Sequence, residues 1–142
     1  MIFKRKNIKR STYTPRSLYK MYGMNKKILE EMIKNADAII KKITPAEVMN
    51  DNKKYLIIDV REAEELQSGG KVENAINIPR GLLEFKLRPS ENLDEDAPIL
   101  VYCAAGLRAA LAGQTLKELG FNNVKNLGGF DDWVQAGGKI DT

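Results

Sequence analysis

Two short apolar runs, separated by segments with a helical pattern, constrain the fold of this chain most strongly. Residues 55–60 and 97–102 are short, almost continuously apolar and bounded by polar or turn-forming residues, which is typical of strands buried on both faces of a sheet. Shorter strands are predicted at residues 75–78 and 123–127. Helices are predicted between and after these strands, at residues 62–67, 81–87, 107–119 and 130–136. Strands that alternate with helices are joined by crossover connections, so the sequence predicts a mainly parallel sheet with helices on both faces.

The first 43 residues differ in charge from the rest of the 142-residue chain. They contain twelve Lys and Arg residues against three Asp and Glu residues, whereas the remainder contains eleven against sixteen. The positive net charge of +4 therefore arises from the N-terminal segment, since the remainder is net negative, and it does not indicate a nucleic-acid-binding domain. Residues 1–23 combine seven basic residues with no acidic residue, which predicts a basic flexible tail. The alternative is a transit peptide for an organelle, but the segment lacks a clear amphipathic helix and contains Pro15.

An amphipathic helix is predicted for residues 24–43, because apolar residues recur there at helical spacing. Acidic residues interrupt its basic face, which favours packing against the following domain over binding to a membrane surface or a partner. Thr44 followed by Pro45 is typical of a helix start, and Glu47 completes a capping box. One domain, residues 44–142, is expected to follow, since a second full domain does not fit. No apolar stretch is long enough to predict a signal peptide or a membrane span.

Reactive side chains are few, because the sequence has no His and a single Cys, Cys103. The lack of an imidazole excludes a Ser-His-Asp triad, a Cys-His dyad and a His-ligated zinc site. A single cysteine also excludes an internal disulfide and a Cys-x-x-Cys redox pair. We therefore expect no metal and no cofactor, and we expect a reducing, cytoplasmic location.

Cys103 lies at the end of the predicted strand 97–102 and shortly before the predicted helix 107–119. Ligands of parallel α/β sheets bind at this edge, where a strand leads into a helix. Small residues in the connecting loop let backbone N–H groups approach a bound group, while the helix N-terminus and Arg108 add positive charge. These features stabilise a thiolate, so the sequence predicts a nucleophilic cysteine that needs no neighbouring base. The alternative is an unreactive cysteine of the core.

Four motifs in chain order resemble the rhodanese-like sulfurtransferase family across residues 43–140. They are Asp59-Val60-Arg61-Glu62, Ala75-Ile76-Asn77-Ile78-Pro79-Arg80-Gly81, the loop with four residues between Cys103 and Arg108, and Leu127-Gly128-Gly129-Phe130 with Trp133. Each motif alone is weak, but the four in this order are specific. The chain departs from the family pattern at Lys71, which replaces a His, and at Glu73-Asn74, which replaces a Pro-Gly turn. Asn adopts the left-handed conformation more readily than most residues, so we expect the turn to persist.

The resemblance implies a three-layer α/β/α fold around a central, mainly parallel five-stranded sheet, here with an N-terminal helical extension. It also implies a single-domain sulfurtransferase of the thiosulfate sulfurtransferase type. Cys103 would take a sulfane sulfur from thiosulfate or a persulfide, hold it as a persulfide, and pass it to cyanide, a thiol or a protein. Arg108 would anchor the anionic donor, and Asp59 and Arg61 would brace the loop. The outer sulfur would be cradled by backbone amides of Ala104, Ala105, Gly106, Leu107 and Arg108.

Two alternative functions share this fold. The first is a binding or regulatory module that transfers little sulfur, although such modules usually lose the cysteine or distort the loop, and this chain retains Cys103 and Arg108. The second is a phosphatase similar to those of the cell cycle, which place five residues between Cys and Arg and tend to have His before Cys. This chain has four residues there, and Tyr102 precedes the cysteine. No motif in the sequence indicates an oligomeric state.

Overall fold

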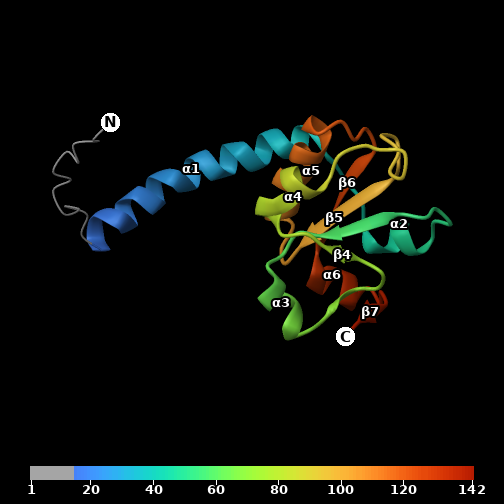
Figure 1. Ribbon diagram of the computed structural model, residues 1–142. Helices are drawn as coiled ribbons and strands as arrows, with labels where there is room; N and C mark the ends of the chain where they lie inside the picture. The colour runs from blue at the N-terminus through green and yellow to red at the C-terminus, as the bar shows by residue number, and fades with distance from the viewer. Residues whose placement is uncertain (1–14) are drawn as a thin grey trace, which may run out of the picture. The chain divides into compact units, whose positions relative to one another are not determined.

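The computed structural model describes residues 15–142, with their side chains from residue 27 onward (Figure 1). Most of the predicted tail, residues 1–14, lies outside the described residues. The chain divides into two compact units, Met1–Met32 and Ile33–Thr142, and every strand found among residues 15–142 belongs to the second.

Helix α1, Pro15–Ile39, differs from the predicted helix at both ends. It begins at Pro15, so residues 15–23 are helical where we expected flexible tail; Pro is favoured in the first turn because its missing N–H has no helical partner to lose. It ends before the predicted residue 43, because strand β1, Lys41–Lys42, pairs with the edge of the sheet instead. In the part of the chain described, no helix has the length and apolar content needed to cross a membrane.

A parallel sheet of five strands forms the centre of the second unit, in the order β1-β6-β5-β2-β4. The strand β1 lies at one edge and was not predicted from the sequence. The other four strands coincide with the four predicted apolar runs, and they are β2 (Leu56–Asp59), β4 (Ile76–Asn77), β5 (Ile99–Cys103) and β6 (Val124–Gly129).

Short helices connect the strands, close to the predicted positions. They are α2 (Pro45–Met49), α3 (Ala63–Gln67), the 3-10 helix η1 (Arg80–Leu82), α4 (Leu83–Lys86), α5 (Leu107–Glu118) and α6 (Phe130–Gln135). The capping box predicted for α2 is present. The Glu47 N–H donates to the Thr44 hydroxyl oxygen over 3.2 Å, and the Thr44 N–H donates to the Glu47 carboxylate over 2.7 Å.

The side chains of β5 alternate between two apolar cores, one on each face of the sheet. Ile99, Val101 and Cys103 pack in the core that contains residues of α4 and α5. Leu100 and Tyr102 pack in the core that contains residues of α2 and α6. Because successive side chains of a strand point to opposite faces, a central strand buried in this way requires helices on both sides. The predicted three-layer α/β/α fold is confirmed (Figure 1).

A second, two-stranded sheet pairs β3 (Lys71–Val72) with β7 (Ile140–Asp141) in antiparallel orientation. Asn74, which follows β3, has a φ of +62°, so the turn persists in the left-handed conformation expected for it. The Asn74 N–H donates to the Asp141 carboxylate over 2.8 Å, and the Lys71 ammonium donates to the same carboxylate over 3.0 Å. Lys71, at the position of the family's His, therefore ties β3 to the C-terminal strand.

Candidate active site

Cys103 is the last residue of β5, where the strand leads toward α5. Its side chain is buried, and its Sγ accepts a hydrogen bond of 3.0 Å from the backbone N–H of Gly106. Gly106 caps α5 with a φ of +91°, a left-handed conformation that strains residues other than glycine. This turn brings the N–H to the sulfur. The N–H group and the positive end of the α5 dipole together favour negative charge at this position.

The outer face of the loop is open. Ala104 and Ala105 are exposed, and so is Leu107, which begins α5 with 52% of its surface accessible. These side chains are small or apolar and carry no charge. A molecule that reaches the loop therefore meets apolar surface and backbone, and any contact with a charged side chain comes from residues around the loop.

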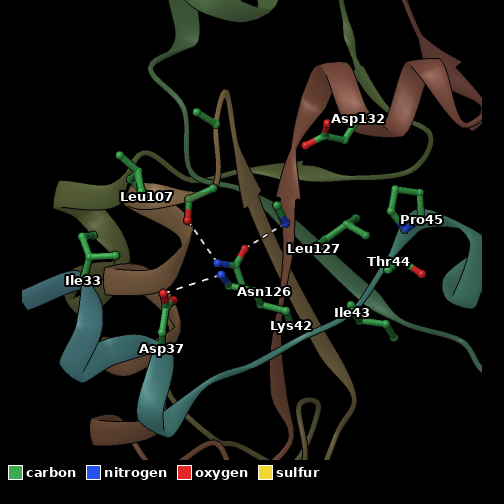
Figure 2. A pocket seen from close by; sticks show the side chains of 13 residues that line it. Ile33, Asp37, Lys42, Ile43, Thr44, Pro45, Leu107, Asn126, Leu127 and Asp132 are labelled. Carbon is green, nitrogen blue, oxygen red and sulfur yellow. Dashed lines mark hydrogen bonds and ion pairs between the residues drawn. The ribbon is translucent and has the colours of Figure 1, made fainter. Parts of the chain in front are cut away.

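Asn126 holds the loop from the side of β6 and was missed by sequence reasoning. This buried side chain donates from Nδ2 to the Gly106 carbonyl over 3.0 Å, and its Oδ1 accepts the Gly128 N–H over 2.8 Å (Figure 2). Gly129 lies so close to the loop that a Cβ there would stand 2.5 Å from the Ala104 carbonyl oxygen. The Gly-Gly motif is thus needed for close packing of β6 against the loop, and Asn126 bridges the two.

Arg108 is paired with Glu65 of α3, a residue that sequence reasoning did not select. Its Nη1 and Nη2 donate to the two carboxylate oxygens over 2.7 and 2.8 Å, in a bidentate arrangement. The Arg108 side chain lowers the pKa of Glu65 to about 2, and Glu65 in turn raises the pKa of Arg108. Cys103 makes a smaller contribution in the same direction to the pKa of Arg108. The cation expected to anchor a donor is thus already partnered.

Asp59 and Arg61 form a buried pair on the opposite face of the sheet from Cys103. Arg61 Nη2 donates to Asp59 Oδ2 over 2.7 Å and to the Gly70 carbonyl over 2.8 Å. The Tyr102 hydroxyl donates to the same Asp59 oxygen and accepts the Val72 N–H over 3.0 Å. Burial, followed by the bond to Asp59, raises the pKa of Tyr102. The pair holds the residue before Cys103, and no described hydrogen bond joins it to residues 103–108.

A cavity of about 370 Å³ lies beside the loop (Figure 2). Its walls come from the end of α1, the segment between β1 and α2, the end of β6, and α6. The lining residues are Ile33, Asp37, Lys42, Ile43, Thr44, Pro45, Ala105, Gly106, Leu107, Asn126, Leu127, Gly128 and Asp132. Among the residues that the structure describes, no three Cys, Asp or Glu side chains are grouped so that they could hold a metal ion.

A central parallel sheet with a lone cysteine at the end of a strand that leads into a helix defines an α/β protein with a candidate site centred on that cysteine. Residues 44–136 match the family model of the rhodanese-like domain, so this chain belongs to the rhodanese-like domain family. The match begins at the N-cap of α2. It therefore excludes α1 and β1, which the second unit of this chain uses to line the cavity.

Known proteins similar to this chain include named sulfurtransferases. Over 76 residues the chain is 41% identical to the thiosulfate sulfurtransferase PspE of Escherichia coli, covering 53% of this chain and 70% of that protein. The polysulfide-sulfur transferase homodimer of Wolinella succinogenes is 32% identical with a TM-score of 0.66, covering 85% and 92%. A Rhodopseudomonas palustris protein of unknown function, described as a possible tyrosine phosphatase, is 32% identical with a TM-score of 0.69, covering 80% and 93%.

Proposed function

We propose that this protein is a single-domain sulfurtransferase, which moves a sulfane sulfur from thiosulfate or a persulfide to a thiophilic acceptor through a persulfide on Cys103. The observation that carries the proposal is the hydrogen bond of 3.0 Å from the Gly106 N–H to Cys103 Sγ at the end of β5. Membership of the rhodanese-like family and the resemblance to named sulfurtransferases support it. Four residues between Cys103 and Arg108 favour sulfur over a phosphate, which family phosphatases bind in a longer loop.

The chemistry consists of two displacements at sulfur. The Cys103 thiolate attacks the outer sulfur of the donor, a new S–S bond forms, and the remainder of the donor leaves with the electron pair as sulfite or a thiolate. An acceptor thiolate or cyanide then attacks the outer sulfur of the persulfide, and Cys103 leaves as a thiolate. Neither displacement needs an imidazole, because nucleophile and leaving group are anions. The Gly106 N–H stabilises the thiolate that begins and ends the cycle.

Arg108 is proposed to attract the anionic donor while its guanidinium remains bonded to Glu65. The carboxylate occupies one N–H on each terminal nitrogen, and a guanidinium has five N–H donors in all. The remaining donors can face a bound anion, but Glu65 offsets the positive charge. Asn126, Asp59 and Arg61 are proposed as positioning residues, because they hold the loop and the end of β5 and do not reach the sulfur through any described contact.

The test is steady-state formation of thiocyanate from thiosulfate and cyanide. We expect Cys103→Ser to reduce the rate to background, a loss of at least about 10³-fold, because the sulfur nucleophile is removed. Thermal melts of both proteins control for folding, because Cys103 is buried in the core and the activity comparison requires a variant that is folded at the assay temperature. A variant that retains activity with thiosulfate and with polysulfide would contradict the proposal. A wild-type protein inactive with both would favour the binding module.

A further inference from the structure

The cavity beside the loop is built partly by a segment outside the family match. Asp37 of α1 and Lys42 of β1 precede residue 44, while Ala105, Gly106 and Leu107 come from the loop. A volume of about 370 Å³ falls within the range of sites for small molecules. Ala105, Gly106 and Leu107 form part of its wall, and the Gly106 N–H is bonded to Cys103 Sγ, so a molecule bound there lies beside the loop that follows Cys103.

The cavity has an apolar wall and an uneven distribution of charge. The apolar part is formed by side chains from four segments, and its residues are Ile33, Ile43, Pro45, Leu107 and Leu127. The Asp37 carboxylate is compensated by the Lys42 ammonium, 3.6 Å away (Figure 2). Asp132 also lines the cavity, and no ion-pair partner for it occurs in the described part of the chain. The lining therefore carries one uncompensated negative charge.

Asp132 lies next to the loop between Cys103 and Arg108. A Cβ built on Gly129 would stand 3.2 Å from Asp132 Oδ2 and 2.5 Å from the Ala104 carbonyl oxygen, so the carboxylate and the loop meet at one point of β6. Gly128 is also adjacent, since a Cβ there would stand 3.8 Å from the same carboxylate oxygen. A cation bound by Asp132 would thus lie within a few bond lengths of the loop that follows Cys103.

We propose that this cavity binds the sulfur acceptor, and that the acceptor is a small thiol carrying an ammonium group. The ammonium pairs with Asp132, the carbon chain lies against the apolar wall, and the thiolate reaches the outer sulfur of the Cys103 persulfide. The acceptor sulfur forms a bond to that outer sulfur, the bond from the outer sulfur to Sγ breaks, and Cys103 retains the electron pair as a thiolate. The acceptor leaves as a persulfide. This inference rests on the proposed function, since it requires a persulfide on Cys103.

The test uses three acceptors of the form HS–CH2–CH2–X, namely cysteamine, 2-mercaptoethanol and 3-mercaptopropionate, with X an ammonium, a hydroxyl or a carboxylate. The full-length protein is first loaded with sulfur from polysulfide, and the rate of discharge to each thiol is measured. Rates are compared between wild type and Asp132→Asn for each thiol separately, so the intrinsic reactivity of the thiol cancels. Asp131→Asn is the matched control, because Asp131 is the exposed neighbour on α6 and does not line the cavity.

We expect Asp132→Asn to lower the discharge rate with cysteamine about fivefold, in keeping with a solvent-accessible ion pair. Discharge to 2-mercaptoethanol should change less than about twofold, and discharge to 3-mercaptopropionate should rise or stay constant. Asp131→Asn should leave all three rates nearly unchanged. The proposed acceptor site is wrong if Asp132→Asn lowers the discharge rate to cysteamine no more than the rate to 2-mercaptoethanol. It is also wrong if Asp131→Asn lowers the rate to cysteamine as much as Asp132→Asn does. In both cases persulfide loading still supports the proposed function. If no persulfide forms, the proposed function fails and this inference fails with it.

Discussion

Tyr102 and Cys103 are adjacent on β5, yet their surroundings differ in every respect that matters for reactivity. The Tyr102 hydroxyl is enclosed in a network in which Asp59, Arg61 and Val72 are all bonded. The Cys103 sulfur receives one backbone N–H, and the loop around it is exposed on its outer face. Because successive side chains of a strand point to opposite faces, the Tyr102 network fixes the end of β5 from one face, while the buried Cys103 sulfur on the other face accepts a backbone N–H. The buried polar network and the candidate nucleophile therefore lie on opposite faces of the sheet.

The largest effect is expected from breaking the buried network. Asp59→Ala leaves the Arg61 guanidinium buried without its carboxylate partner, which should cost about 3–5 kcal/mol in the free energy of unfolding. Tyr102→Phe removes only the hydroxyl and leaves the Val72 N–H unpaired, at an expected cost of about 1–3 kcal/mol. Denaturant-induced unfolding measures both. A cost below about 1 kcal/mol for Asp59→Ala would contradict the view that this face supplies the rigid support.

A smaller effect on stability and a clear effect on sulfur transfer are expected at Asn126, which connects β6 to the loop. Asn126→Ala removes the side-chain hydrogen bond to the Gly106 carbonyl, which keeps only the bond from the Ala110 N–H, and it unpairs the Gly128 N–H. The loop should therefore shift, and persulfide loading should slow about tenfold or more. Asn123→Ala is the control, because Asn123 is exposed and lies directly before the same strand. Equal loading rates in the two folded variants would show that Asn126 does not position the loop.

Substitution of Glu65 tests how far the charge beside Arg108 affects the binding of an anionic donor. Glu65→Gln removes the negative charge beside Arg108, so the KM for thiosulfate should fall about three- to fivefold. Glu64→Gln, at an exposed neighbour on α3, should leave the KM unchanged, and added salt should reduce the difference between the variants. A KM that rises in Glu65→Gln would mean that Glu65 orients Arg108 for the donor and does not compete with it.

The smallest effect is a pH dependence of stability. Since the pKa of Glu65 is lowered to about 2 from its ordinary value of 4.5, the Arg108 pair contributes stability above about pH 4.5 and loses it as the pH falls toward 2. Thermal melts of wild type and Glu65→Gln should therefore converge across this window. The effect is small because both side chains are about one-third exposed and screened by solvent. A difference in melting temperature that does not vary with pH would contradict it.

The fold could be predicted where apolar patterns determine it. Strands β2 and β5 lie inside the sheet with a core on each face, so their sequences are almost continuously apolar and predict buried strands. Strand β1 could not be predicted, because Lys41 and Lys42 are exposed and become a strand only through pairing with β6. The same pairing explains why the predicted helix extended too far toward residue 43.

The site could be predicted only in part. Cys103 was found because a single cysteine stood between a buried strand and a helix. Glu65 could not be distinguished from Glu62 and Glu64 nearby, since its partner Arg108 lies 43 residues away in the chain. Asn126 left a weak signal, a polar residue within a short apolar strand directly before Leu127 and the two glycines. Both missed residues act through tertiary contacts, which local patterns do not encode.

Intact mass spectrometry shows whether Cys103 carries a transferable sulfur. The protein is measured alone, after excess thiosulfate or polysulfide, and again after cyanide, with Cys103→Ser as the control. We predict that the mass of one sulfur atom is gained, is lost on addition of cyanide, and never appears in the variant. A wild-type protein that gains no sulfur from either donor, or a variant that gains as much as wild type, would contradict the account.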